Sequence, residues 1–197
     1  MKQKSRTEYS VMNTTVAFLA QTLAIFMGFF TRVVFTRTLS EGYVGINGLF
    51  TDILNILSLS ELGVGTAITY ALYAPIARRD IKKQQILMRM FRNFYRITAG
   101  FVLLAGLCLI PFLDILMKDR PDVNHLIIIY LLYLLNSVVS YLLIYKKTLV
   151  DAHQMNYITV MYHNGFLVLQ DILQIMVLFL TRNFILFLVI AVICTII

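Results

Sequence analysis

Residues 32–65 read RVVFTRTLSEGYVGINGLFTDILNILSLSELGVG, and this stretch decides how the rest of the chain is interpreted. It is mostly apolar, yet it contains two arginines, one aspartate and two glutamates, and long hydrophobic segments flank it on both sides. Much of it is therefore expected at membrane depth, where an ionisable side chain costs at least a few kcal/mol. Such side chains usually face the interior of a helix bundle or a water-filled cavity. The sequence therefore predicts a membrane-embedded polar site early in the chain.

The composition indicates an integral membrane protein. Of the 197 residues, 59% are hydrophobic and 14% are charged, whereas soluble domains average about half and about a quarter. Several uncharged stretches approach the roughly 20 residues that are needed to cross a bilayer. The 17 Lys and Arg against 10 Asp and Glu are explained by the retention of basic residues in cytoplasmic loops, so no nucleic-acid partner is expected.

The hydrophobic segments and the polar turns between them predict an all-α polytopic membrane protein with six helices. We place these helices at about 11–37, 43–74, 94–117, 126–145, 157–180 and 184–197. The second is expected to be about 48 Å long, which exceeds the bilayer core, and Gly63 and Gly65 offer a place for a bend before Pro75 ends the helix. The sixth has fewer than the roughly 17 residues of a spanning helix. The chain is therefore expected to be an N-terminal fragment with a truncated sixth helix.

Basic residues are distributed unevenly between the two sides of the predicted helices. Twelve Lys and Arg lie in the N-terminus, after the second helix and after the fourth, and five lie on the alternate side. This asymmetry predicts a cytoplasmic N-terminus. Four of the basic residues form a helical stripe after Pro75, namely Lys82, Arg89, Arg92 and Arg96. We expect this stripe to lie on an interfacial helix and to bind anionic lipid, and capture of a phosphorylated lipid headgroup is the sharper alternative.

Arg32 and Asp52 are the main candidates for a functional site. Counted from the turn at residues 40–42, they lie at depths of about 12 and 17 Å, which is close enough for them to pair. One interpretation is a buried ion pair that fixes how the first two helices pack. The other is a cationic cavity in which Asp52 holds Arg32 until a substrate binds. Arg37 lies nearer the surface, where its side chain can reach water.

Further polar side chains occur inside the predicted helices. Glu61 lies two and a half turns after Asp52, so in a straight helix it faces the opposite side. A hydrogen-bonded, protonated carboxyl is the simpler interpretation of Glu61. Asp171 and Gln174 form either a cavity-facing patch that includes a coupling acid or a tie between helices, and the same choice applies to Asn136.

Patterns typical of catalysis, metal binding or cofactor binding are missing from the sequence. His153 and His163 lack the spacing of metal ligands on a helix, and Cys108 and Cys194 lie in apolar runs without a CxxC motif. The sequence has no P-loop, dinucleotide-binding fingerprint or pairing of nucleophile and base. We therefore predict no cofactor, no metal and no enzyme activity.

Residues 32–68, RVVFTRTLSEGYVGINGLFTDILNILSLSELGVGTAI, resemble the N-terminal region of Wzx-type polysaccharide-unit flippases. These belong to the multidrug/oligosaccharidyl-lipid/polysaccharide exporter superfamily, together with lipid II flippases and MATE antiporters. The resemblance is carried by an arginine late in the first helix, by the turn TRTLSEGYVG and by the run ELGVGTAI. It implies a MATE-like transporter with two helix bundles around a central cavity, of which this chain supplies the six-helix N-terminal bundle.

The resemblance also implies a function in the bacterial inner membrane. That function is the export of undecaprenyl-diphosphate-linked oligosaccharide by alternating access, with Arg32 and Arg37 helping to hold the diphosphate. The implied partners are membrane lipids and the polysaccharide polymerase and glycosyltransferases of the same pathway. One alternative is cation-coupled efflux of small molecules, with Asp52 or Asp171 as the coupling acid. Another is a membrane assembly subunit, or a membrane-embedded glycosyl- or acyltransferase, although no loop is long enough to house such an active site.

Overall fold

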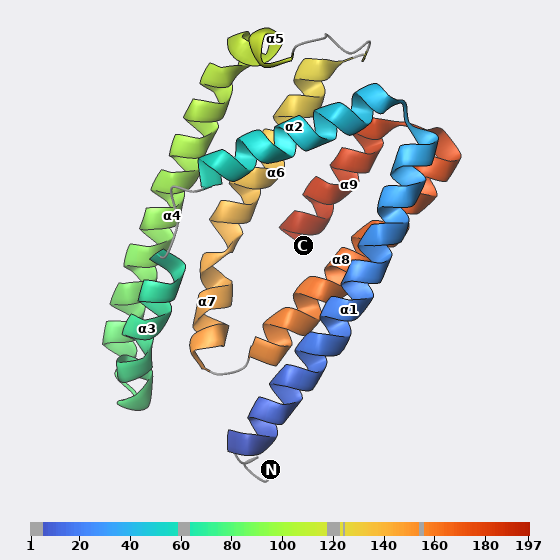
Figure 1. The fold of residues 1–197 in the computed structure, drawn as a ribbon. Coiled ribbons are helices and arrows are strands. Elements are labelled where there is room, and N and C mark those ends of the chain that lie inside the picture. The colour runs from blue at the N-terminus through green and yellow to red at the C-terminus, as the bar shows by residue number, and fades with distance from the viewer. Residues whose placement is uncertain (1–5, 59–63, 118–122, 124, 154–155) are drawn as a thin grey trace.

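The computed structural model describes residues 6–58, 64–117, 123, 125–153 and 156–197, and these residues form helices and no strand. The helices make two groups that lie on either side of the molecule (Figure 1). The first group pairs α1 (Arg6–Thr38) with α8 (Asn156–Thr181). The second contains α3 (Val64–Ala77), α4 (Ile81–Leu109), α6 (Leu126–Leu143) and α7 (Tyr145–Ala152). Two short turns, η2 (Ile110–Phe112) and α5 (Leu113–Leu116), follow α4.

Two helices connect these groups. α2 (Glu41–Ser58) crosses obliquely from the end of α1 toward α4 and α6 (Figure 1). α9 (Phe184–Ile196) follows α8 and packs against both α8 and α6. The two groups of helices are therefore held together where α2 and α9 lie.

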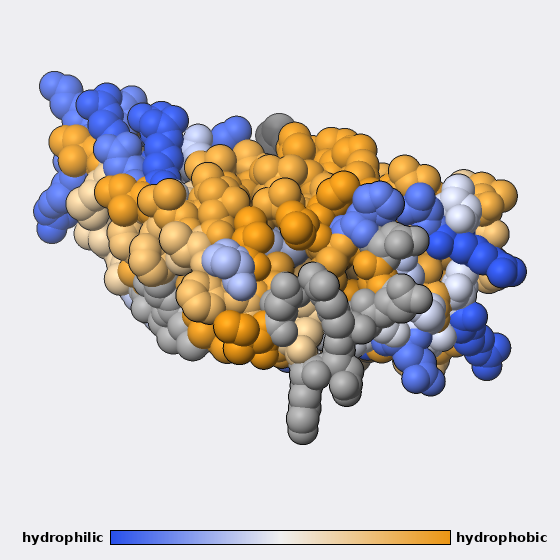
Figure 2. All heavy atoms as spheres, turned by 90° about the horizontal axis from the view of Figure 1, so that it is seen from above, coloured by the Kyte–Doolittle hydropathy of each residue, from blue (hydrophilic) through white to orange (hydrophobic). Residues whose placement is uncertain are grey.

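Four helical stretches are long and apolar enough to cross a membrane. They are Thr14–Thr38, Ile81–Phe112, Leu126–Ala152 and Ile158–Thr181, whereas α3 and α9 are apolar but shorter. These stretches overlap the predicted first, third, fourth and fifth spans, with different bounds. Figure 2 shows a broad apolar surface with hydrophilic side chains gathered at its ends. The architecture is consistent with an all-α, multi-pass membrane protein.

The predicted second helix, 43–74, is not a single element in the described residues. α2 ends at Ser58 and α3 begins at Val64, while Glu61 and Gly63 lie outside the part of the chain that is described. Pro75 lies inside α3 and is buried, so the prediction that it ends the helix was wrong. A proline lacks an N–H donor but keeps its carbonyl. The Pro75 carbonyl accepts hydrogen bonds from the backbone N of Asp80 at 2.9 Å and from Gln84 Nε2 at 3.1 Å.

The basic segment after Pro75 is the first part of α4 and not a separate interfacial helix. Asp80 caps α4, since its Oδ1 accepts a hydrogen bond from the backbone N of Lys83 at 3.0 Å. After Pro75, the next proline is Pro111, which falls in η2. α4 is therefore continuous from Ile81 to Leu109 and begins well before the predicted 94–117 span. Of the basic stripe, Lys82, Arg89 and Arg96 are exposed and Arg92 is half-buried.

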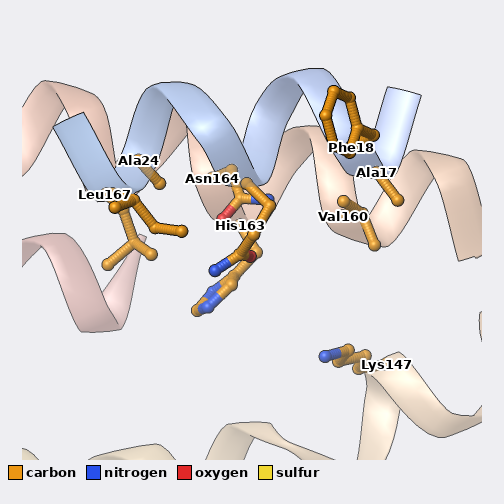
Figure 3. Close-up of a pocket in the computed structure, with 10 residues that line it drawn as sticks. Ala17, Phe18, Ala24, Lys147, Val160, His163, Asn164 and Leu167 are labelled. Carbon is orange, nitrogen blue, oxygen red and sulfur yellow. The ribbon is translucent and has the colours of Figure 1, made fainter. Parts of the chain in front are cut away.

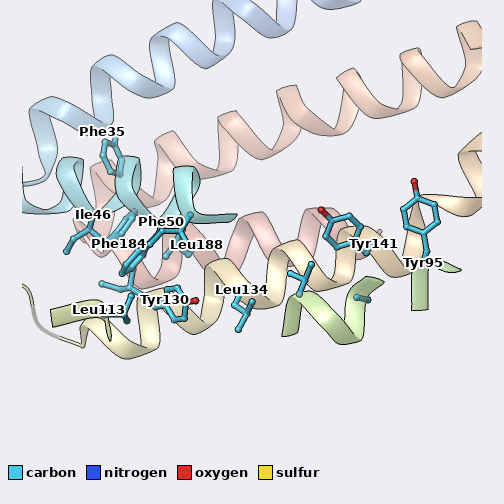
Figure 4. Close-up of a cluster of buried hydrophobic side chains, with 14 of the residues drawn as sticks. Phe35, Ile46, Phe50, Tyr95, Leu113, Tyr130, Leu134, Tyr141, Phe184 and Leu188 are labelled. Carbon is cyan, nitrogen blue, oxygen red and sulfur yellow. The ribbon is translucent and has the colours of Figure 1, made fainter. Parts of the chain in front are cut away.

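The core is a cluster of aromatic and aliphatic side chains from α1, α2, α6 and α9, and it continues to buried residues of α3 and α4 (Figure 4). The rings of Phe35 and Phe184 have centroids 5.4 Å apart, and those of Phe50 and Tyr130 are 5.1 Å apart, both in edge-to-face arrangements. Such pairs are each worth about 0.5–1.5 kcal/mol beyond the area that they bury. These ring pairs join α1 to α9 and α2 to α6.

α4 and α6 approach closely at Gly106. A Cβ atom at this position would overlap the side chain of Leu134 on α6, so only glycine fits without movement of that side chain. The Tyr130 hydroxyl donates a hydrogen bond of 2.8 Å to the Gly106 carbonyl oxygen. Small residues and interhelical hydrogen bonds are typical of packed helices in membranes. The α4–α6 contact is therefore tightly specified.

Candidate functional site

A polar groove lies between α2 and α6. Its volume is about 400 Å³, and its polar lining is Thr51, Asn55, Tyr133, Asn136, Ser137, Ser140 and Tyr141. The lining contains hydroxyls, amides and two phenol rings but no charged side chain. We call this site the α2–α6 groove. A hollow with several hydrogen-bonding groups is unusual on apolar helices, where an unsatisfied polar group is costly.

Some groups of the α2–α6 groove are held by neighbouring helices, and others are available. The Tyr133 hydroxyl donates a hydrogen bond to Asn47 Oδ1 on α2, and Asn136 Oδ1 accepts one of 2.8 Å from Thr195 on α9. Within the described part of the chain, the Asn136 amide nitrogen and the Ser137 hydroxyl have no hydrogen-bond partner. The groove therefore presents fixed donors and acceptors to a neutral polar ligand.

Arg32 is not among the residues that line the α2–α6 groove. It projects from α1 as an exposed side chain, and its guanidinium lies 5.4 Å from the centre of the Phe35 ring. Tyr133, which lines the groove, is within electrostatic range of the Arg32 charge. A permanent cation that acts on the lining of a neutral polar groove suits a ligand with one anionic end.

Arg32 and Asp52 form no ion pair with each other, although both side chains are described. The depth estimate assumed that α1 and α2 run upright beside one another. α2 instead crosses the molecule obliquely (Figure 1), so equal residue counts from the turn do not give equal positions. Asp52 is exposed on α2 and is not among the residues that line the groove. The buried-bridge interpretation is therefore wrong, and Arg32 is left available for another anion.

The remaining candidates are dispersed. Arg37 is exposed in the last turn of α1, and Glu61 lies outside the described residues. Asp171 is half-buried on α8. Gln174 is buried, and its Nε2 donates a hydrogen bond of 3.1 Å to the Phe187 carbonyl oxygen on α9. Gln174 therefore connects α8 with α9.

A second hollow lies between α1, α7 and α8, and we call it the α1–α7–α8 pocket (Figure 3). Its volume is about 670 Å³, and its polar lining consists of Gln21, Lys147, His163 and Asn164. Asn164 is only 4% exposed. Lys147 projects from α7 and lies across the pocket from His163 and Asn164 (Figure 3). This site contains a cation, whereas the α2–α6 groove is neutral.

The sequence interpretation singled out neither hollow, although a signal for the groove exists. Tyr133, Asn136, Ser137, Ser140 and Tyr141 recur at helical spacing and therefore form one polar stripe on an otherwise apolar helix. The α1–α7–α8 pocket has no comparable signal, because its lining comes from three helices that are distant in sequence. Within the described residues, no group of three or more His, Cys, Asp or Glu side chains is placed to hold a metal, and Cys108 and Cys194 are free.

We compared the chain with protein-family models, with curated proteins and with solved structures, and none of them matches.

Proposed function

We propose that this protein moves lipid-linked oligosaccharide across a bacterial inner membrane, as a flippase that works by alternating access. The observation that carries the proposal is the electrostatic influence of Arg32 on Tyr133, a residue that lines the neutral α2–α6 groove. The substrate class has the matching chemistry, since it joins an anionic diphosphate to uncharged sugars. In this proposal the chain is one bundle of a MATE-like two-bundle transporter, with its N-terminus in the cytoplasm.

The sugar part of such a substrate suits the α2–α6 groove. Sugar hydroxyls both donate and accept hydrogen bonds, and amide and hydroxyl side chains can do the same without a charge. The Asn136 amide nitrogen and the Ser137 hydroxyl are free of partners within the described residues, while Tyr133 is held in place by Asn47. A pre-positioned lining of this kind reduces the entropy that a ligand must lose on binding.

The diphosphate suits Arg32. A guanidinium remains charged, and its planar fork of donors can bind two phosphate oxygens together. Asp52 makes no ion pair with Arg32, so a phosphate does not have to displace a carboxylate. We propose Arg37, five residues further along α1, as a second contact for the headgroup.

Replacement of Arg32 tests the proposal. Arg32→Ala is expected to abolish export of the cell-surface polysaccharide while membrane insertion is unchanged, because Arg32 is exposed and makes no ion pair with any residue that the structure describes. Arg32→Lys should restore only part of the export, since an ammonium keeps the charge and loses the fork. Export would be measured as surface polysaccharide at matched levels of protein in the membrane.

The matched control is Arg78→Ala, which removes an exposed arginine that does not line the groove. It should leave export unchanged. Normal export by Arg32→Ala, or an equal loss in both variants, would count against a diphosphate site at Arg32.

A further inference from the structure

The α1–α7–α8 pocket combines a polar end with an apolar wall. Lys147, His163, Asn164 and Gln21 supply the polar end, and most of the remaining lining is aliphatic or aromatic, including Phe18 and Ile25 on α1. Phe18 and Ile25 are 69% and 62% exposed, so the apolar wall continues onto the outer surface of α1. An occupant that matches this pocket must therefore have both a polar group and an apolar portion.

Asn164 places an amide group at the polar end of the pocket. The residue is buried as a whole and its side chain makes no hydrogen bond within the described residues, but its amide atoms are not fully enclosed and are open to the pocket. Asn164 lines the pocket and is labelled there in Figure 3. A ligand in the pocket would supply the partner that the protein does not.

The charges around Asn164 select an anion. Lys147 makes no ion pair within the described part of the chain, and no Asp or Glu lines the pocket. The nearest acidic residue in sequence, Asp151, is engaged elsewhere, since its Oδ1 accepts a hydrogen bond of 2.6 Å from the Thr159 hydroxyl. An ammonium, an imidazole and two amides can together donate several hydrogen bonds to phosphate oxygens.

We infer that the α1–α7–α8 pocket binds the phosphate headgroup of an anionic membrane lipid, with an acyl chain along Phe18 and Ile25. The inference goes beyond the proposed function, because it concerns a different pocket and a lipid that need not be transported. The continuous apolar wall favours a lipid over free phosphate, since inorganic phosphate has no apolar portion to bury against it.

The experiment uses fluorescence, because the chain has no tryptophan. Phe18→Trp places a single reporter on the pocket wall, and Leu19→Trp places one on an exposed neighbour that does not line the pocket. Each variant is reconstituted in phosphatidylcholine vesicles that contain one brominated lipid, either phosphatidic acid or phosphatidylcholine. Brominated phosphatidic acid should quench the tryptophan fluorescence of Phe18→Trp at about a tenfold lower mole fraction of lipid than brominated phosphatidylcholine does. The fluorescence of Leu19→Trp should be quenched equally by both lipids.

Two substitutions in the Phe18→Trp background identify the headgroup contact. Lys147→Gln should abolish the preference for phosphatidic acid, whereas Lys146→Gln should preserve it. Both lysines are exposed on α7, but only Lys147 lines the pocket. Asn164→Leu should reduce the preference without any change of charge, and the thermal unfolding of each variant confirms that it is folded.

Three outcomes would overturn the inference. They are equal quenching of Phe18→Trp by the two lipids, an equal effect of Lys146→Gln and Lys147→Gln, and release of the quenching by inorganic phosphate. An equal effect of the two lysine substitutions would mean that general surface charge causes the preference for phosphatidic acid. Release of the quenching by inorganic phosphate would mean that the site binds free phosphate. None of these measurements depends on transport, so failure of the flippase proposal would leave them unaffected.

Discussion

The α4–α6 pair and the α1–α8 pair are both long helix contacts, but they differ in how their polar groups are satisfied. In each of the spans built on α4 and α6, 28% of the most apolar window is buried, compared with 11% for α1 and 17% for α8. The Tyr130 hydroxyl between α4 and α6 has a hydrogen-bond partner in the Gly106 carbonyl. The side-chain amide of Asn164 on α8 opens onto the α1–α7–α8 pocket and has none within the described residues.

This difference separates a part of the molecule that determines folding from a part that is available for binding. A hydroxyl that is hydrogen-bonded between two helices gains nothing from a ligand, and its removal costs stability. An amide that opens onto a pocket beside a lysine without an ion pair in the described residues loses little stability on substitution and can gain from a ligand. Three predictions test this division, and each compares two matched positions.

The largest effect is expected at Gly106. Gly106→Ala should lower the free energy of unfolding by about 1–3 kcal/mol, because the new Cβ overlaps Leu134 and must displace it. Gly100→Ala is the control on the same helix, since a Cβ there meets nothing within 4 Å. Alanine favours the helix over glycine, so Gly100→Ala should stabilise the protein by up to about 1 kcal/mol. Denaturant titration in detergent micelles measures the free energy of unfolding of both variants. Equal values would show that α4 and α6 are loosely packed at Gly106.

The sequence predicts the helices far better than their contacts. Long apolar runs bounded by Pro, Asn and basic residues predicted four of the spans, because the length of a membrane helix is set by the bilayer. Nothing in the local sequence distinguishes Gly106 from Gly100, since the difference lies in Leu134, 28 positions further along the chain.

The sites show the same limit. Arg32 was recognised because a charge among apolar residues is visible in the sequence. Its pairing with Asp52 was wrong because that prediction required the direction of α2, which depends on the tertiary fold. The α1–α7–α8 pocket was missed for a similar reason, since Gln21, Lys147 and Asn164 come together only when three helices pack.

A smaller loss is expected when the hydroxyl between α4 and α6 is removed. Tyr130→Phe should lower the free energy of unfolding by about 1 kcal/mol, because the Tyr130 hydroxyl donates to the Gly106 carbonyl in a buried position. Tyr162→Phe is the control, since Tyr162 is 62% exposed, and it should have no measurable effect. The same titration distinguishes them, and a neutral Tyr130→Phe would mean that the aromatic packing of Tyr130, and not its hydrogen bond, stabilises the contact.

The smallest effect, and the one that most directly separates the two parts of the molecule, concerns two asparagines. Asn136 Oδ1 accepts a hydrogen bond of 2.8 Å from Thr195, so Asn136→Leu should cost about 0.6 kcal/mol, a typical value for a hydrogen bond between membrane helices. The loss is limited because the Thr195 hydroxyl also lies 2.9 Å from the Ala191 carbonyl oxygen and can donate there instead.

Asn164 has no such partner within the described residues. Asn164→Leu removes an amide that opens onto the pocket, and the pocket leaves room for the larger side chain, so the free energy of unfolding should stay constant or rise. The two variants are compared in detergent without added lipid, because a lipid in the pocket would satisfy Asn164 and hide the difference. If Asn164→Leu proved the more destabilising of the two, Asn164 would be part of the folding core, and the α1–α8 contact would no longer differ in kind from the α4–α6 contact.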